Sequence, residues 1–290
     1  MPYMKETCVA GRTVEVRRYY NFHVPYPGEH RGKREHPTPE RIRKANLRKA
    51  ETDLRRLINA NFTNEGYSVT ITYRTGEEPG DIDELRKDAA LYLRKITRAA
   101  KKRGQIFKYV YVLGAGAHRR HIHIIMQGMD VKDIGDMWDK GHVSMTRLYS
   151  EPDFRELAAY FIKNAEDTRE QEISQGKKPR RRYNTSHNLK KPLVKKEKIP
   201  AKEFRKNPRI PKGYQLDKET MVNGISDLTG MPYQSYTLLK DKENVGSKFI
   251  HCDRAERKHK RKRSRSIRDG DDAEERPEGS KDRKNGNDRP

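Results

Sequence analysis

A short stretch in the middle of the chain, from His118 to Met126, constrains the fold more than any other, because polar and apolar side chains alternate within it. Successive side chains of a β-strand point to opposite faces of the sheet. One face of the predicted strand is apolar and can pack on a core: Ile122, Ile124 and Met126. The other, more polar face carries His121 and His123. Two neutral imidazoles side by side form one edge of a divalent-metal site, and a surface strand with two chance histidines is the alternative.

A second stretch, from Ser150 to Ala165, has the pattern of an amphipathic helix, with Ser150 as the N-cap and Pro152 in the first turn. Its apolar side chains recur at helical spacing on one face: Phe154, Leu157, Ala158, Phe161, Ile162 and Ala165. Tyr160 and Lys163 lie off this face and are three residues apart, which makes them neighbours on the helix surface. An ammonium group beside a phenol can lower the pKa of the phenol or neutralise a phosphate. The pair is therefore a candidate nucleophile with an electrostatic partner.

Together the two stretches resemble the HUH endonucleases, in which a His–hydrophobic–His strand precedes a tyrosine-bearing helix. The pattern is most similar to that of the single-tyrosine rolling-circle replication initiators of phages, plasmids and integrative elements, whose Tyr-x-x-Lys motif corresponds here to Tyr160–Lys163. The similarity covers about half of the chain, in the right order. It also includes Asn61-Phe62, the strand Val69–Tyr73, Trp138, Gly141–Val143, Ser186–Leu189 and Pro192.

The resemblance implies a metal-dependent nicking reaction. His121 and His123 would hold Mg²⁺ or Mn²⁺, Tyr160 would attack the phosphodiester to form a 5′-phosphotyrosine and a free 3′-OH, and Lys163 would orient or neutralise neighbouring groups. Later attack by a 3′-OH would rejoin the strand. Many relatives carry an acidic third metal ligand at the end of the preceding strand, where this chain has Gly114. His118, an acid from another loop, or water could complete the ligand set.

The remaining elements favour an α+β fold, with an antiparallel sheet of about five strands and helices packed on one face. The resemblance implies the same architecture, of HUH or ferredoxin-like type. Thr38 and Pro39 begin a helix that is expected to reach about Asn59, and Asp81 begins a second helix that Gly104 ends.

The order of these patterns predicts four regions. Residues 1–60 form an N-terminal extension of strands and a helix, and residues 61–192 the endonuclease domain. Residues 193–250 form a small C-terminal appendage, and residues 251–290 a disordered charged tail, basic at its start, because they have few apolar side chains.

Charge indicates a nucleic-acid partner, because the formal net charge is +23 and 37% of the residues are charged. A basic segment with an aromatic residue follows the tyrosine helix, and it suits the backbone and stacked bases of single-stranded DNA. The DNA-binding residues predicted there are Arg180, Arg181, Arg182, Tyr183, Lys190 and Lys191. A charged loop without a ligand is the alternative.

Location and partners follow from what the sequence lacks. No apolar run approaches the ~18 residues of a membrane span, and the N-terminus has no apolar signal-peptide stretch. Cys8 and Cys252 form no disulfide framework, so the expected compartment is the cytoplasm of a bacterial host cell. The sequence has no phosphate-loop motif, and a host helicase and polymerase are therefore expected partners. The oligomeric state, the origin sequence and the physiological metal stay open.

Three other functions remain alternatives. A mobilisation relaxase or a small transposase would use the same chemistry. A noncatalytic single-stranded nucleic-acid-binding protein would give Tyr160 no role. A histidine-dependent nucleotide hydrolase would need a third alternating histidine, where this chain has Ile125.

Overall fold

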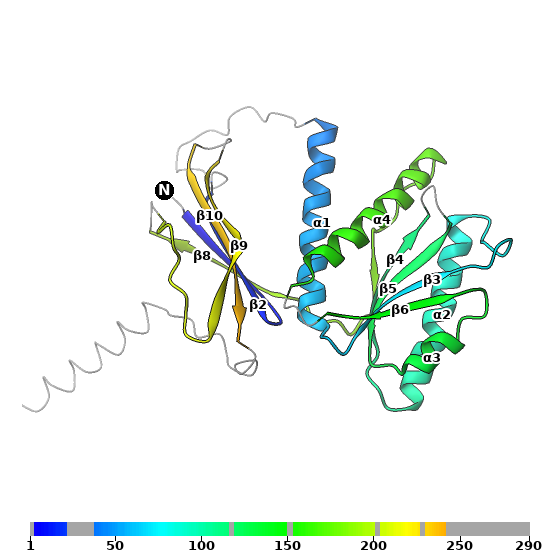
Figure 1. Ribbon diagram of the computed structural model, residues 1–290. Coiled ribbons are helices and arrows are strands. Elements are labelled where there is room, and N and C mark those ends of the chain that lie inside the picture. Colours follow the sequence, from blue (N-terminus) through cyan, green and yellow to red (C-terminus); the bar gives the residue numbers. More distant parts are fainter. Residues whose placement is uncertain are drawn as a thin grey trace, which may run out of the picture. The chain divides into compact units, whose positions relative to one another are not determined.

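The computed structural model describes residues 3–21, 38–115, 119–149, 153–200, 204–226 and 230–241 (Figure 1). The expected tail, residues 251–290, lies outside the described residues, as do His118 and Ser150. The helices are α1 (Pro39–Asn61), α2 (Ile82–Lys102), α3 (Val131–Asp136) and α4 (Arg155–Ser174). The strands are β1 (Tyr3–Ala10), β2 (Thr13–Tyr20), β3 (Tyr67–Thr72), β4 (Lys108–Gly114), β5 (His121–Gln127), β6 (Val143–Arg147), β7 (Asn184–Thr185), β8 (Leu193–Ile199), β9 (Tyr214–Ile225) and β10 (Pro232–Lys240).

The first of two antiparallel sheets contains the predicted histidine strand at its centre, and we call it the histidine sheet. Its five strands are ordered β6-β3-β5-β4-β7. In β5, His123 lies opposite Thr70 of β3, and His121 lies opposite Gly114 of β4. The α+β class and an antiparallel sheet of about five strands are thus confirmed.

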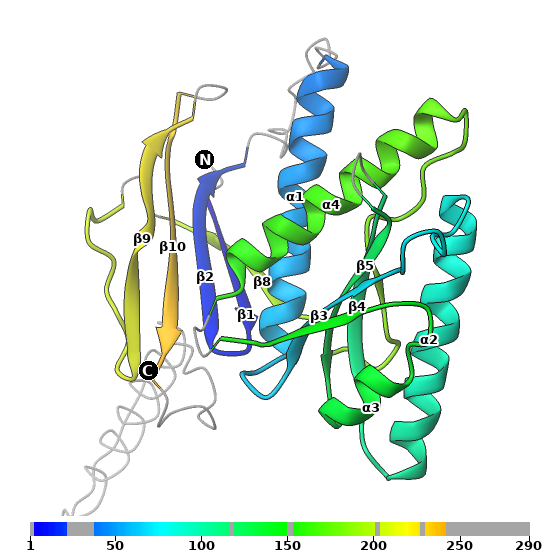
Figure 2. The same ribbon diagram turned by 45° about the vertical axis from the view of Figure 1, so that its right-hand side comes forward.

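Helices cover both faces of the histidine sheet, whereas the sequence led us to expect helices on one face (Figures 1 and 2). Ile122, Ile124 and Met126 pack with α2 and α3 on one side. On the other side, Ile125 packs with apolar residues of α1 and α4. The expectation of one covered face is wrong because the face that carries the histidines is also apolar enough to form a core. We call this second core the α1/α4 core.

Helix α2 follows its sequence pattern closely. The Asp81 side chain accepts a hydrogen bond from the Glu84 backbone N–H, and Gly104 ends the helix with a φ of +67°. Its apolar side chains recur at helical spacing, and all seven on this face are buried: Ile82, Leu85, Ala89, Tyr92, Leu93, Ile96 and Ala100. Helix α1 follows its pattern only in part, because Leu54 and Ile58 are buried while Ile42 is 46% exposed.

Helix α4 begins later than predicted. Its first helical residue is Arg155, and Phe154 is the N-cap without a side-chain cap of its own. The Phe154 backbone N–H donates instead to Asn59 Oδ1 of α1, at 3.0 Å. The start predicted at Ser150 is therefore wrong, and a neighbouring helix supplies the acceptor that local sequence was expected to supply.

The second antiparallel sheet is ordered β8-β1-β2-β10-β9, and the sequence did not predict it. It joins strands from the two regions expected to be an N-terminal extension and a C-terminal appendage, because β1 pairs with β8 and β2 pairs with β10. The β1–β2 turn lies against α1. Gly11 there has a φ of +58°, and a Cβ at this position would lie 2.0 Å from the Asn59 carbonyl oxygen. Only glycine permits this approach.

All described residues fall within one compact unit, Met1–Val245. No helix among them is long and apolar enough to cross a membrane.

Candidate active site

The structure brings the predicted nucleophile to the predicted metal ligands. The Tyr160 hydroxyl on α4 lies 3.1 Å from His123 Nε2 on β5, across the α1/α4 core side of the histidine sheet. The tyrosine remains 50% exposed, whereas His123 is only 3% exposed. The side of the strand that was expected to be wet is therefore covered by α4. A phenol that is open to solvent on one side and held by an imidazole on the other can reach an incoming phosphodiester.

His123 is fixed at both ring nitrogens. Its Nδ1 lies 3.0 Å from Thr70 Oγ1 on the neighbouring strand, and its Nε2 faces the tyrosine. Burial, and to a smaller extent the nearby His121, lowers the pKa of His123 from 6.5 to about 4. His123 is therefore neutral at neutral pH and offers one lone pair, to either a hydrogen-bond donor or a metal.

His121 has a defined tautomer. Its Nδ1 lies 2.7 Å from the Arg119 carbonyl oxygen, which can only accept, so Nδ1 carries the proton and Nε2 of the neutral ring carries the lone pair. Nε2 faces Oδ1 of Asn164 at 3.3 Å. The amide orientation of Asn164 is set by its Nδ2, which donates to the Tyr160 carbonyl oxygen at 2.8 Å. When the ring is neutral, two lone-pair atoms therefore face each other.

This facing pair fits a shared cation. With metal–ligand distances of ~2.1 Å, neighbouring ligands of an octahedral ion lie ~3 Å apart. The two imidazole rings are also close, with centroids 4.6 Å apart. Within the described ranges, no group of three or more His, Cys, Asp or Glu residues could hold a metal. His121, His123 and the amide oxygen of Asn164 are the groups here that could hold a divalent ion.

Gly114 explains why no acid serves as a ligand from β4. A Cβ at this position would lie 2.2 Å from His121 Nε2, so any side chain there would force the imidazole to move. An acid at position 114 and His121 in its observed place exclude each other. Asn164, one helical turn after Tyr160, was missed in the sequence, although its spacing from Tyr160 places both on one side of α4.

Lys163 does not contact the tyrosine hydroxyl or the imidazoles. Tyr160, Lys163 and Arg43 line a groove of about 480 Å³ between α1 and α4. Four acids also line it, Glu51, Glu166, Asp167 and Glu170, and Arg43 is paired with Glu166 and Glu170. Lys163 is exposed and makes no hydrogen bond or ion pair with any described residue. Its ammonium group is free to meet a phosphate that enters this groove.

The predicted DNA-binding segment after α4 is partly tied to the fold by ion pairs. Arg182 Nε binds Glu166 at 2.9 Å, and Arg180 binds Asp83 at 3.2 Å. Tyr183 is half-buried and packs on the α1/α4 core, and burial raises the pKa of its phenol. The exposed cations of the segment are Arg180, Arg181, Lys190 and Lys191. Three of the six predicted side chains, Arg180, Arg182 and Tyr183, thus have structural partners.

Comparison with known families gives one match. Residues 66–169 match the family described as Replication-associated protein ORF2/G2P. The matched segment begins just before β3 and ends inside α4, so it contains both histidines, Tyr160, Lys163 and Asn164. No curated protein and no solved structure matches the chain.

Proposed function

We propose that this chain, whose residues 66–169 match the family described as Replication-associated protein ORF2/G2P, initiates rolling-circle DNA replication by nicking one strand at an origin. The observation that carries the proposal is the 3.1 Å contact between the Tyr160 hydroxyl and His123 Nε2. A noncatalytic nucleic-acid-binding module would not require a half-exposed tyrosine beside two positioned imidazoles. A relaxase or a transposase would share this chemistry, and we place the chain with replication initiators because of the matched family.

Tyr160 is the nucleophile in the proposed reaction. Its oxygen attacks the scissile phosphorus, a tyrosine–phosphorus bond forms, and the bond from phosphorus to the 3′ oxygen breaks. The proton lost by the phenol ends on the 3′ oxygen, which leaves as a free 3′-OH. The phosphotyrosyl bond keeps the energy of the broken linkage, so a later 3′-OH can attack it and reseal the strand.

A divalent ion, Mg²⁺ or Mn²⁺, would be held by His121, His123 and Asn164, and it would supply positive charge to a non-bridging phosphate oxygen. The His123–Thr70 hydrogen bond keeps the imidazole oriented toward Tyr160. Lys163, which is exposed in the groove beside Tyr160, would neutralise a neighbouring phosphate.

The expected partners and location follow from the released 3′-OH. The released 3′-OH can prime a host polymerase, and unwinding is assigned to a host helicase, so the protein would act in the cytoplasm of a bacterial cell. Tyr160 is the tyrosine of α4. Rejoining would use Tyr160 again or the tyrosine of a second subunit.

The test uses labelled single-stranded oligonucleotides that tile the DNA flanking the gene, incubated with the full chain and Mn²⁺ and separated by denaturing electrophoresis. We expect one oligonucleotide to yield a nick and a covalent adduct at its 5′ phosphate. Tyr160→Phe should abolish both, because phenylalanine offers no nucleophile, while Tyr149→Phe serves as the matched control and should keep both. Peptide mapping of the adduct to any residue other than Tyr160, or full nicking in excess EDTA, would contradict the proposal.

A further inference from the structure

A second groove, of about 1210 Å³, lies on the opposite side of α1 from the α1/α4 core, between α1 and the second sheet. Residues of β1, β2, β8, β9 and β10 line it, together with α1 and Arg155 at the start of α4. It lies outside the matched segment except for Arg155.

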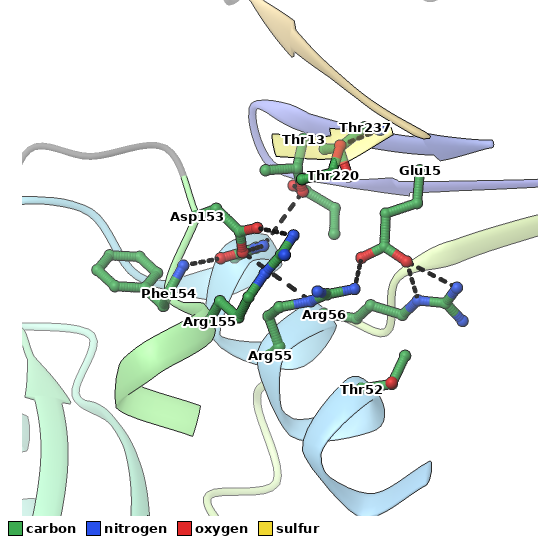
Figure 3. Close-up of polar contacts among 12 residues, drawn as sticks. Thr13, Glu15, Thr52, Arg55, Arg56, Asp153, Phe154, Arg155, Thr220 and Thr237 are labelled. Atoms are coloured by element: carbon green, nitrogen blue, oxygen red, sulfur yellow. Dashed lines mark hydrogen bonds and ion pairs between the residues drawn. The ribbon is translucent and has the colours of Figure 1, made fainter. Parts of the chain in front are cut away.

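The acids deep in this groove are neutralised by α1 (Figure 3). Glu15 of β2 binds Arg55 at 2.6 Å and Arg56 at 2.8 Å, and Arg56 also lies 3.6 Å from Glu6. The Glu6 and Glu15 side chains are only 11% and 9% exposed, so a ligand in the groove barely meets their charge. On the α1 side, Asp53 is paired with Lys49, which leaves Glu51 as the unpaired acid of the lining.

The exposed charge of the groove is positive. Arg17 of β2 and Arg48 of α1 are exposed on opposite walls, and neither side chain pairs with a described residue. Arg155 and Lys196 each bind one acid, yet their side chains are 47% and 56% exposed. Four cations from four different elements therefore point to one anionic ligand that extends along the groove rather than to a small ion.

The other lining groups favour a sugar-phosphate backbone over unpaired bases. Hydroxyl side chains from α1, β9 and β10 line the groove: Thr52, Thr220, Ser235 and Thr237. Arginine and hydroxyl side chains are the usual partners of DNA phosphates. Binding of single strands relies on exposed aromatic rings on which bases stack. The aromatic lining residues here are the buried Tyr236 and the half-buried Tyr233, whose ring lies against Gly224, so among its described residues the groove offers at most one ring for stacking.

The elements that line this groove are connected to the nucleophile helix by Asn59, which lies outside the groove lining. Asn59 of α1 donates to Thr13 of β2 at 3.2 Å and to Asp153 at 3.1 Å, and it accepts from the Phe154 backbone N–H at the start of α4. One side chain thus joins the second sheet, α1 and the helix that carries Tyr160. A ligand in the groove is held in a fixed relation to the nicking site.

We propose that this groove binds the backbone of duplex DNA that flanks the strand to be nicked, with Arg17 and Arg48 as its principal phosphate contacts. The choice of DNA as the polyanion rests on the proposed function, but duplex binding needs neither Tyr160 nor a metal. The two proposals can therefore fail separately.

The test measures binding of a short blunt-ended duplex of mixed sequence by the full chain over a range of salt concentrations. Arg17→Gln combined with Arg48→Gln should lower the slope of log affinity against log salt by about 2, since each lost phosphate contact releases about one counterion fewer. Arg94→Gln combined with Arg98→Gln is the matched control, because these exposed arginines of α2 lie on the other side of the histidine sheet. The control should keep the parental slope.

A rescue pair, Arg17→Lys with Arg48→Lys, should restore the slope, because lysine keeps the point charge. Equal loss in the groove variant and the control, or no loss in either, would overturn the proposal. So would a groove variant that loses affinity for a single-stranded oligonucleotide but not for the duplex. Nicking of single-stranded DNA is measured in the same variants and should persist, which separates failure of this proposal from failure of the nicking function.

Discussion

The two sides of α1 are held in opposite ways. Toward the histidine sheet, Leu54 and Ile58 are fully buried in the α1/α4 core among apolar side chains. Toward the second sheet, Arg55 and Arg56 reach Glu15 through ion pairs. Apolar packing depends on area and shape and tolerates small shifts, whereas a buried ion pair requires each charge to find its partner. The comparison indicates that the apolar side supplies stability and the polar side fixes the position of the second sheet.

The largest loss of stability is expected when the ion pairs between α1 and the second sheet are removed. Glu15→Ala would take the nearest acceptor from two largely buried guanidinium groups and leave them only the more distant Glu6 and Asp153. This should cost about 4 kcal/mol in the free energy of unfolding, measured in urea. Glu40→Ala is the matched control, since its ion pair with Lys44 is exposed and should be worth less than about 0.5 kcal/mol. Equal, small effects of both substitutions would show that the polar junction is not a structural requirement.

Removing an apolar side chain of α1 from the α1/α4 core should lower the free energy of unfolding slightly less. Leu54→Ala removes a fully buried side chain from the α1/α4 core and should lower the free energy of unfolding by about 3 kcal/mol. Leu91→Ala on α2 is the control, because Leu91 is 47% exposed and its loss should stay within about 0.5 kcal/mol. A Leu54→Ala protein as stable as the control would mean that α1 is held mainly through the second sheet.

His123 is a buried polar group on the side of the histidine sheet that faces the α1/α4 core. The pKa of His123 is about 4 in the folded chain, against 6.5 for a free histidine. The unfolded chain therefore takes up a proton more readily, and stability should fall as the pH drops from neutral toward 4, by on the order of 2–3 kcal/mol. The measurement is urea unfolding with a chelator at several pH values. In His123→Gln the free energy of unfolding should no longer fall over this pH range for this reason. The same dependence on pH in the parent and in His123→Gln would show that the fall does not come from the lowered pKa of His123.

The smallest expected effect concerns the proposed third ligand. Asn164→Ala should weaken Mn²⁺ binding about tenfold, as loss of one of three protein ligands, whereas Asn164→Asp should strengthen it by adding a charge. Binding is followed by electron paramagnetic resonance of free Mn²⁺, with no DNA present. Asn46→Ala, an exposed asparagine of α1, is the control. Parental affinity in Asn164→Ala would leave His121 and His123 as the only protein ligands.

The helices and strands that could be predicted from the sequence are those with a clear pattern among neighbouring residues. The alternation in β5 placed both histidines on one face, and the limits of α2 followed from its capping residues Asp81 and Gly104. The approximate position of the tyrosine helix was also readable, because its apolar side chains recur at helical spacing. These features depend on residues that are close in the chain, where periodicity carries the information.

Contacts between residues far apart in the chain could not be predicted from the sequence and became visible in the tertiary structure. The charged strand β8, Leu-Val-Lys-Lys-Glu-Lys-Ile, has no clear strand pattern and forms because β1 supplies its backbone partners. The start of α4 depends on an acceptor from Asn59, and the facing of Asn164 and His121 depends on how α4 lies on the sheet. Such contacts join residues far apart in the chain. Their partners are fixed by packing and hydrogen-bond satisfaction rather than by the local order of side chains.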